Sequence, residues 1–422
     1  MSRSVDCHFD AHCHIFDIHY LIREIGHMLR DAVDGDYPHH KPTGDLDFPE
    51  SPTASISGLL HWISELVDAS HGGEEENLDM VAAAGAKAHG DELPIKVIPL
   101  MMDVYFMLAE PVLQGEFAPI RKRKKDRLRQ WLTVRDAQVD KKIAALLRKK
   151  NTKSSEISRI LSLIKPRLLD TFLDAMLSLL RKSPPYFDSR GFRFELEQMR
   201  TLSLKRPGSI YPFLAVDPRR TGLIDSIIKA GQLVGKGKPF AGIKLYPRLG
   251  YHPQCADLMP LYRWCEKHKI PIVSHCDQIG FPPPELEKIL HIDQGDFGNP
   301  IHFEKVLTDF PDLIIDFAHF GMSNPTWANQ ISTYMGKYPN VYSDLACYTT
   351  SGVVDEFYQT QWHKPKVAER TLFGTDFDVM YFVTPGITLD IYYRNFMTTK
   401  AFSPEEIQAL TCHNPKRFLG IE

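Results

Sequence analysis

Long hydrophobic runs are missing from this sequence of 422 residues. The most apolar long window, 94–113, is interrupted by Lys96, Asp103 and Glu110, which argues against a transmembrane helix. The N-terminus lacks a signal-peptide pattern, because residues 1–4 lead directly into a predicted strand. Cysteine is also sparse, and the seven cysteines are scattered without a CxxC pair, which favours a reducing compartment. We therefore expect a cytoplasmic protein without membrane contact.

An excess of charge of either sign is missing as well. The chain has 50 Lys and Arg against 53 Asp and Glu, a formal net charge of −3 and a pI near 6.7. This balance argues against a bulk attraction to nucleic acid or anionic membrane. One basic run, 121–125, lacks interleaved aromatic residues, so we interpret it as a solvated helix face. The alternatives are a subunit interface in a homo-oligomer, a lid over an active site, or a surface for an acidic partner.

The composition is that of an ordinary globular protein, with 43% hydrophobic and 24% charged residues. Short apolar runs alternate with amphipathic segments, and this alternation predicts parallel βα units. The expected strands are Phe9–His14, Ile95–Met101, Ser209–Val216, Phe240–Tyr246, Ile270–His275, Leu313–His319, Val341–Asp344 and Arg370–Asp376. Eight such units predict a (β/α)₈ TIM barrel, in which the site lies at the carboxyl ends of the strands.

The region between the second and third strands differs from this pattern. Residues 108–205 carry the basic run and a Leu- and Ile-rich helical pattern over 157–180. We therefore divide the chain into a barrel, 1–107 and 206–422, and a helical, partly basic insertion, 108–205.

The first strand carries a dense group of polar side chains. Side chains alternate between the two faces of a strand, so Asp10, His12 and His14 are expected on one face. Ala11 and Cys13 are expected on the other face, where they would pack against helices. Two imidazoles at this spacing can reach one metal ion. The alternative is that both histidines are polar residues at a strand end, hydrogen-bonded or solvated.

Later strands end in the same kind of residue. Lys244 lies near the end of the fourth strand, and His275, His319 and Asp376 end the fifth, sixth and eighth. Three neutral imidazoles and a carboxylate suit Zn²⁺ or a similar divalent ion. Such an ion lowers the pKa of bound water to about 7. A remaining His or Asp can then shuttle the proton.

These segments resemble the amidohydrolase superfamily, and within it the group that includes aminocarboxymuconate-semialdehyde decarboxylase. The matching segments are Asp10–His14, Phe213–Arg219, Gly242–Pro247, Val273–His275, Phe310–Asp312, Ala318–Gly321, Asn340–Asp344, Phe373–Asp376 and His413–Gly420. The resemblance covers 6–20 and about 208–422, in the right order, but not the insertion.

The resemblance implies roles for five side chains. His12, His14, His275 and Asp376 would hold the metal, one ion rather than two, most simply Zn²⁺. His319 would polarise the substrate or move protons, and Asp376 would accept a proton from water.

The resemblance leaves Lys244 open. In binuclear relatives a carboxylated lysine at this strand bridges two metals, but a cationic substrate contact or a paired lysine within the barrel is the simpler interpretation. Arg248 could clamp a substrate carboxylate bidentately, or be a surface arginine on a loop. We also expect Tyr246 and Asp378 to face the substrate. Asp378 stands where the family often has Pro, so the substrate itself does not carry over.

Other polar residues receive simpler interpretations. We interpret His8 as a core histidine and Cys276 as packing. His39 and His40 lie in a Pro- and Asp-rich loop and are expected to be exposed. Asp344 ends the seventh strand, either supporting a ligand or capping a loop.

The sequence therefore predicts a metal-dependent hydrolase that attacks an amide, ester or lactone carbonyl of a small molecule. The substrate could bear a carboxylate. The first alternative is a metal-dependent decarboxylase of an aromatic or unsaturated acid, which would use the same ligands. The second is a non-catalytic barrel scaffold that docks partners through the basic insertion.

Overall fold

A computed structural model describes most of the predicted barrel. The described residues are 7–15, 74–89, 95–103, 190–280, 295–322, 324–348, 350–377, 388–397 and 399–421. Three sequence predictions lie outside these ranges: Asp378, the His39–His40 pair and most of the helical insertion.

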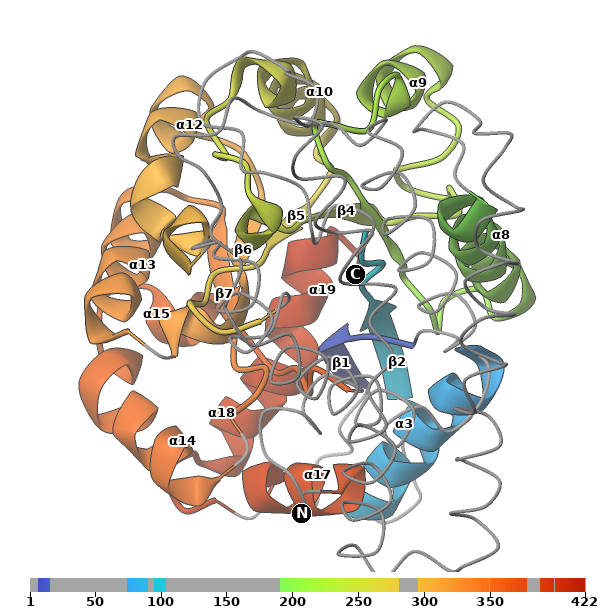
Figure 1. Cartoon of the computed structure of the whole chain (residues 1–422). Helices are drawn as coiled ribbons and strands as arrows, with labels where there is room; N and C mark the ends of the chain where they lie inside the picture. The colour runs from blue at the N-terminus through green and yellow to red at the C-terminus, as the bar shows by residue number, and fades with distance from the viewer. Residues whose placement is uncertain are drawn as a thin grey trace, which may run out of the picture.

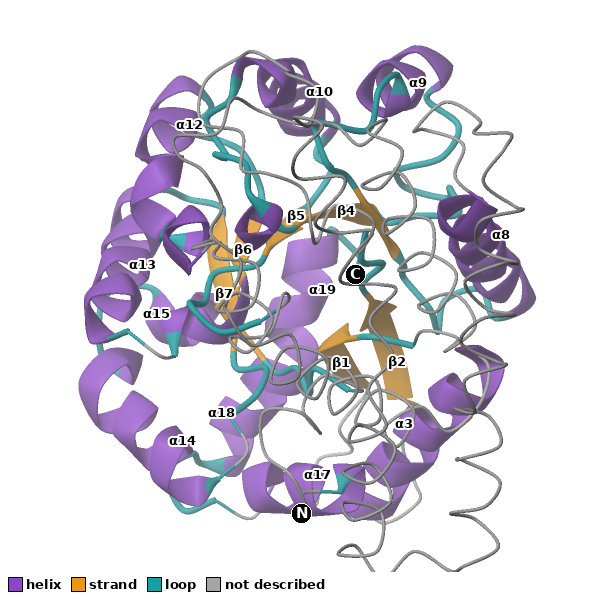
Figure 2. Ribbon diagram, viewed as in Figure 1, coloured by secondary structure: helices purple, strands orange, loops and turns teal. Residues whose placement is uncertain are grey.

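Eight parallel strands form the centre of the described chain (Figure 2). They are β1 (His8–Cys13), β2 (Ile95–Pro99), β3 (Phe213–Ala215), β4 (Gly242–Leu245), β5 (Ile272–Ser274), β6 (Ile315–Phe317), β7 (Val341–Asp344) and β8 (Thr371–Leu372). Strands β3 to β8 pair in sequence order, and β1 pairs with β2. The predicted order of strands is confirmed, although most strands are shorter than the apolar runs that predicted them.

Backbone hydrogen bonds close this sheet into a barrel. Met101 N donates to Phe213 O at 3.0 Å, which joins the chain after β2 to β3. Ala11 N donates to Phe373 O at 2.8 Å, which joins β1 to the end of β8. The predicted parallel barrel is therefore present among the described residues.

Helices surround the barrel as an outer ring (Figure 1). The α-helices described are α3 (Glu74–His89), α8 (Arg190–Lys205), α9 (Leu223–Ala230), α10 (Met259–His268), α12 (Glu304–Asp309), α13 (Pro325–Lys337), α14 (Ser351–Phe357), α15 (Val367–Arg370), α17 (Leu389–Met397), α18 (Pro404–Gln408) and α19 (Asn414–Leu419). Local sequence fixes where several begin. The side chain of Asn324 accepts from two backbone amides at the start of α13, and Ser403 with Glu406 forms a capping box on α18.

Helix α8 lies in the region that the sequence assigned to the insertion. Its Phe192, Met199 and Leu202 are buried in the main hydrophobic core. The Arg220 guanidinium, from the segment after β3, lies 4.1 Å from the centre of the Phe192 ring. This helix therefore packs on the barrel as part of the connection between β2 and β3.

A small apolar cluster fills the barrel interior. It contains Ala11, Ile98, Leu100, Phe213, Val273, Ala318, Tyr342, Leu372 and Phe418. Phe418 comes from α19, and its ring lies 5.9 Å from Phe213 and 5.3 Å from Tyr342. Residues that precede β3, β4 and β6 pack against the same cluster. Helix α19 therefore closes the amino-terminal end of the barrel, and the site is left to the carboxyl end.

The predicted faces of the first strand are wrong in part. Ala11 belongs to the interior cluster, whereas Asp10 bonds to the hydroxyl of Tyr393 in α17, outside the barrel. The reason is an irregularity in the pairing of β1 between Asp10 and Cys13, which breaks the strict alternation of side chains. With this irregularity, His12 still faces the carboxyl end of the barrel, whereas Asp10 lies outside the barrel.

The expectation of reduced cysteines also needs a correction. Cys7 and Cys412 form a disulfide between the chain just before β1 and the segment before α19. The other cysteines are free. A scattered pattern cannot reveal this bond, because the two residues are 405 positions apart in the sequence.

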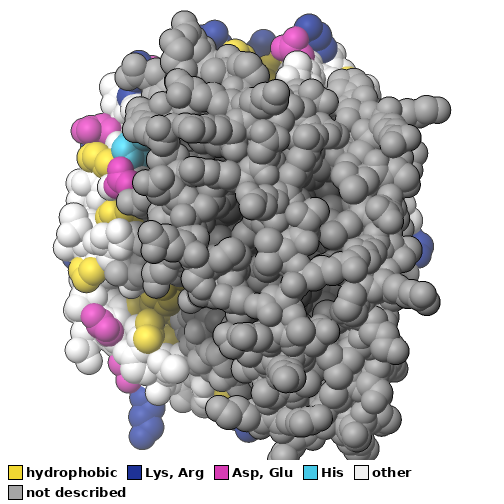
Figure 3. All heavy atoms as spheres, viewed as in Figure 1, with side chains coloured by type: hydrophobic (Ala, Val, Ile, Leu, Met, Phe, Trp, Pro, Cys, Tyr) yellow, Lys and Arg dark blue, Asp and Glu magenta, His cyan; other side chains and the backbone are white. Residues whose placement is uncertain are grey.

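The described surface carries mixed charges. In the face that Figure 3 shows, acidic, basic and single apolar side chains are interspersed over the described atoms. None of the described helices has the length and apolar character required to cross a bilayer.

Candidate metal centre

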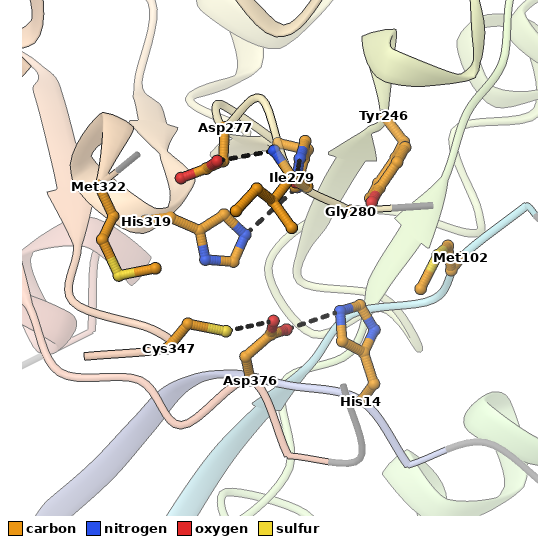
Figure 4. A pocket seen from close by; sticks show the side chains of 11 residues that line it. His14, Met102, Tyr246, Asp277, Ile279, Gly280, His319, Met322, Cys347 and Asp376 are labelled. Carbon is orange, nitrogen blue, oxygen red and sulfur yellow. Dashed lines mark hydrogen bonds and ion pairs between the residues drawn. The ribbon is translucent and has the colours of Figure 1, made fainter. Parts of the chain in front are cut away.

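Polar side chains that lie on or just after five strands meet at the carboxyl end of the barrel. Figure 4 shows three of them, His14, His319 and Asp376, around one cavity. His12 and His14 come from β1 and the residue after it, and Asp344 ends β7. His275, His319 and Asp376 follow β5, β6 and β8. All six residues are buried, each with 4% of its surface or less exposed.

Asp344 fixes the orientation of His12. Its Oδ2 lies 2.7 Å from Nδ1 of His12, and its Oδ1 accepts from the backbone amides of His319 and Ala346. Burial would raise the pKa of Asp344, but the nearby His12 imidazole holds it well below its ordinary value. An ionised carboxylate can only accept, so Nδ1 of His12 carries a hydrogen and Nε2 is the ring nitrogen turned towards Asp376. The two alternatives for Asp344 are both met, since it supports His12 and caps a loop.

His14 gives the clearest indication of a bound cation. Its Nδ1 lies 2.7 Å from the carbonyl oxygen of Leu100, which can only accept, so this nitrogen carries the hydrogen. Burial lowers the pKa of His14 to about 4, so the ring is neutral at pH 7. Nε2 of His14 therefore carries a lone pair and no hydrogen, and it lies 3.2 Å from Oδ1 of Asp376. Two acceptors at this distance repel each other unless a cation lies between them.

Asp376 lies at the centre of the group. Its Oδ1 is 3.2 Å from Nε2 of both His12 and His14, and its Oδ2 accepts from the thiol of Cys347 at 3.0 Å. Burial alone would raise the pKa of Asp376, but the imidazole of His12 holds it well below its ordinary value. Oδ1 of Asp376 and Nε2 of His12 are buried without a hydrogen-bond partner. Ionised carboxylate and neutral imidazole are ligands that divalent metals accept, so the residues fit such an ion.

Ligand atoms of His12, His319 and Asp376 lie within 4.8 Å of one another, which allows all three to reach one ion. The cavity beside them has a volume of about 30 Å³. A volume of this size accommodates one water molecule or one ion.

His319 lies across this cavity from His14 (Figure 4), and it forms a pair with His275. Nε2 of His275 lies 3.0 Å from the carbonyl oxygen of Ile279 and carries the hydrogen, and its Nδ1 faces Nε2 of His319 at 3.2 Å. Burial lowers the pKa of both imidazoles. In the described geometry His319 is therefore nearer than His275 to the group of His12 and Asp376.

Strained backbone gathers at this cavity. His319, Cys347 and Asp376 have φ values of 67°, 67° and 57°, in the left-handed region that non-glycine residues rarely adopt. Each such residue costs about 1–3 kcal/mol and persists only where surrounding contacts hold it. The three residues follow β6, β7 and β8 and line the same cavity. Strain concentrated in this way is typical of a functional site.

Two aspartates near β2 and β3 are committed to ion pairs. Asp103 pairs with Arg220, and Asp217 pairs with Arg219, with all four side chains buried. These acids are therefore neutralised by their own partners. Asp376, which follows β8, is the carboxylate that contacts His12 and His14.

Two cationic side chains line the barrel beside the histidines. Nζ of Lys244 is buried without a hydrogen-bond partner, and burial lowers the pKa of this lysine to about 8. Arg248 is also buried, and both positive charges contribute to lowering the pKa of His275. The ring of Tyr246 stacks on His275 with 4.3 Å between ring centres. The predicted substrate residues Lys244, Tyr246 and Arg248 thus adjoin the site.

The structure agrees with the interpretation of His8 as a core histidine and of Cys276 as a packing residue. His8 is buried between the rings of Phe373 and Tyr393, as a core histidine would be. Cys276 is buried, and burial raises the pKa of its thiol well above the ordinary value, which does not suit a nucleophile.

Sequence reasoning missed Cys347 and Asp316. Cys347 follows Asp344 by three residues, and its place after a strand end was the available signal. Asp316 is buried within β6, and burial together with the charge of Asp344 raises its pKa well above the ordinary value. Nothing in an apolar strand pattern indicates which neighbour Asp316 will meet.

Comparison with known proteins identifies a related family. Residues 187–421 match the sequence model of the family described as Amidohydrolase. A sequence search of curated proteins finds no match.

Several solved structures resemble the chain at low identity. The 2,6-dihydroxybenzoate decarboxylase from Rhizobium is 14% identical, over 57% of this chain and 82% of that one, with a TM-score of 0.40. A 5-carboxyvanillate decarboxylase from Novosphingobium aromaticivorans, complexed with manganese and a nitrobenzoic acid, is 13% identical over 68% and 93%, with a TM-score of 0.43. The 4-oxalomesaconate hydratase from Rhodopseudomonas palustris is 16% identical over 68% and 93%, with a TM-score of 0.39.

Proposed function

Because the chain belongs to the amidohydrolase family, we propose that it is a metal-dependent hydrolase of a small molecule. The bond attacked would be that of an amide, ester or lactone. The observation that carries this proposal is the contact between Nε2 of His14 and Oδ1 of Asp376, two acceptors 3.2 Å apart. A divalent ion between them would turn this repulsion into coordination.

The metal would be held by His12, His14, His275 and Asp376, with His319 beside it for proton transfer. The three-residue core of His12, His14 and Asp376 rests on the distances above. For the fourth ligand we retain His275, as the family resemblance implies. The reverse assignment, with His319 as ligand and His275 behind it, agrees with the 4.8 Å grouping of His12, His319 and Asp376. The metal content of the His275→Ala and His319→Ala variants separates these two assignments.

A divalent ion at this position would polarise a carbonyl and lower the pKa of water to about 7. Asp376 would accept a proton because its buried carboxylate is held in the ionised form beside the His12 imidazole. His319 would move a proton to or from the substrate, since its imidazole lines the cavity beside Asp376. Lys244 and Arg248 would provide a positive wall that attracts a carboxylate on the substrate.

Decarboxylation of an aromatic or unsaturated acid is the second candidate. The buried cations Lys244 and Arg248 favour it as much as hydrolysis of a carboxylate-bearing substrate, because both reactions begin by binding an anion. The two reactions differ in what leaves the substrate. Release of CO₂ and incorporation of oxygen from labelled water, measured on one panel of carboxylates, amides, esters and lactones, distinguish them.

Metal analysis tests the proposed site directly. We expect protein purified without chelator to contain one divalent ion per chain and a His12→Ala/His14→Ala variant to contain none. A matched control replaces His268, an exposed residue at the end of α10, by Ala and keeps the metal. Metal-free wild-type protein with unchanged function in the double variant would favour the scaffold alternative.

The finer properties of the enzyme are proposals too. We propose Zn²⁺ as the native ion, since imidazole and carboxylate suit it. For the compartment we propose the cytoplasm, as the scattered cysteines suggested. The redox state of the Cys7–Cys412 pair in the cell tests this compartment, because a disulfide that persists there would contradict a reducing environment.

A further inference from the structure

Cys347 occupies an unusual position at the end of β7. It is buried, and its φ of 67° lies in the left-handed region, where a glycine would carry no steric cost. The chain nevertheless places a thiol here. A side chain held at such a cost calls for a contact that glycine could not make.

That contact is with Asp376. Sγ of Cys347 lies 3.0 Å from Oδ2 of Asp376, and Figure 4 shows the thiol on one side of the carboxylate and His14 on the other. Oδ1, the other oxygen, is 3.2 Å from Nε2 of His12 and of His14. Of the two oxygens of Asp376, Oδ2 thus contacts the thiol and Oδ1 contacts the two imidazoles.

A third residue fixes the spacing between the two segments. The hydroxyl of Tyr392, from α17, lies 2.9 Å from the carbonyl oxygen of Leu345 and 2.8 Å from that of Gly374. Each of these carbonyls is two residues before a member of the pair, Cys347 or Asp376. Tyr392 therefore ties the ends of β7 and β8 together and keeps the thiol in reach of the carboxylate.

We propose that Cys347 is a positioning residue, whose thiol hydrogen occupies Oδ2 of Asp376 and leaves Oδ1 as the single oxygen presented to the metal. The inference rests on the proposed metal function. Without the donor, Asp376 would be free to turn and present either oxygen or both. An alcohol at this position would preserve the donor, whereas a methyl group or a hydrogen would not.

Direct ligation of the metal by Cys347 is the competing role. A coordinating sulfur must be a thiolate, and thiolate bound to Co²⁺ gives an intense charge-transfer absorption that oxygen and nitrogen ligands lack. The spectrum of the Co²⁺-loaded protein therefore distinguishes a thiol that acts through Asp376 from a thiolate that binds the ion.

The test uses four full-length proteins and Co²⁺ as the probe. Apo wild type and the variants Cys347→Ser, Cys347→Ala and Cys347→Gly are titrated in competition with a chelating dye. We expect Cys347→Ala and Cys347→Gly to bind Co²⁺ about 10- to 100-fold more weakly, as loss of a ligand's outer hydrogen bond does. Cys347→Ser should bind within a few-fold of wild type.

The glycine variant separates a local effect from misfolding. Gly relieves the left-handed backbone at Cys347, so Cys347→Gly should unfold at a urea concentration equal to or higher than wild type. Weaker Co²⁺ binding in a protein of undiminished stability supports the positioning role.

Three results would contradict the proposal. Equal Co²⁺ affinity in wild type, Cys347→Ala and Cys347→Gly would overturn the inference and leave the proposed function intact. A thiolate-to-cobalt band in wild type would overturn it in favour of direct ligation. Absence of Co²⁺ binding by wild type would overturn the proposed function and, with it, this inference.

Discussion

Oδ2 of Asp344 lies 2.7 Å from Nδ1 of His12, while Oδ1 of the same carboxylate accepts from the backbone amide of His319 at 2.9 Å. One buried acid therefore orients the imidazole of His12 in β1 and holds the backbone of His319 after β6. Because the carboxylate can only accept, it fixes a hydrogen of His12 on Nδ1 and turns Nε2 towards Asp376. The predicted metal site depends on this acid, although Asp344 is not among the proposed ligands.

Asp344→Asn should weaken metal binding without removing a proposed ligand. An amide has one acceptor oxygen, which cannot serve both the His319 amide and His12 Nδ1. If the amide nitrogen faces His12, the imidazole hydrogen moves to Nε2 and blocks the lone pair. We expect Kd for Zn²⁺ to rise about 10- to 100-fold, measured by chelator competition.

A matched control uses an exposed aspartate. Asp225 in α9 forms an i,i+4 ion pair with Lys229 on the surface. Asp225→Asn should leave Kd for Zn²⁺ unchanged. Equal Kd values for Asp344→Asn and the wild type would contradict the orienting role of Asp344.

His275→Ala and His319→Ala should differ in metal content. If His275 is the fourth ligand, His275→Ala loses most of its metal, whereas His319→Ala keeps the metal and loses turnover by about 100-fold or more. The measurement is metal per chain by elemental analysis, beside the rate on the best substrate of the panel. The opposite pattern, with metal lost in His319→Ala and kept in His275→Ala, would exchange the two roles.

The order of the strands could be predicted from the sequence, because apolar runs separated by amphipathic segments reflect burial that is local to each run. The ends of the apolar runs led to His275, His319 and Asp376, although β5, β6 and β8 themselves end one, two and four residues earlier. These residues meet at one end of the barrel because the strands that precede them run parallel.

Contacts between distant segments could not be predicted in this way. The irregularity in β1 accompanies bonds from Asp10 to Thr375, whose position in the sequence is 365 residues away. The hydrogen on Nδ1 of His14 is fixed by the carbonyl of Leu100, a backbone atom with no signature in residue type. The left-handed backbone of Cys347 likewise has no signature, since left-handed positions are recognised by glycine.

The disulfide should stabilise the fold measurably. Cys7 and Cys412 join two ends of the described chain, so the bond limits the freedom of the unfolded state. We expect a Cys7→Ser/Cys412→Ser variant to be less stable by about 2–5 kcal/mol in urea unfolding. Alkylation of the unfolded protein without reductant should modify the five free cysteines and spare the bonded pair.

Reduction gives the control for this prediction. A reducing agent should lower the urea midpoint of the wild type and leave that of the double-serine variant unchanged. Alkylation of all seven cysteines without reductant would show that the bond is absent in solution.

Lys244→Met should lower the rate on a carboxylate-bearing substrate without lowering the stability of the fold. Nζ of Lys244 is buried without a hydrogen-bond partner, and burial lowers its pKa to about 8, so its charge opposes folding. Replacing it by an apolar side chain of similar length should leave the urea midpoint unchanged or raise it. The rate on a carboxylate-bearing substrate should fall about 10- to 100-fold, because a hydrogen bond to a charged group contributes about 1.5–3 kcal/mol.

The control for this change is Lys267→Met, at an exposed position of α10. It should alter neither the rate nor the stability. A second comparison uses an analogue of the substrate in which the carboxylate is a carboxamide. If Lys244 binds the carboxylate, Lys244→Met loses the preference of the wild type for the anion over the amide. A preference that survives the substitution would assign anion binding to another group, of which the buried Arg248 is the nearest candidate by sequence and by charge.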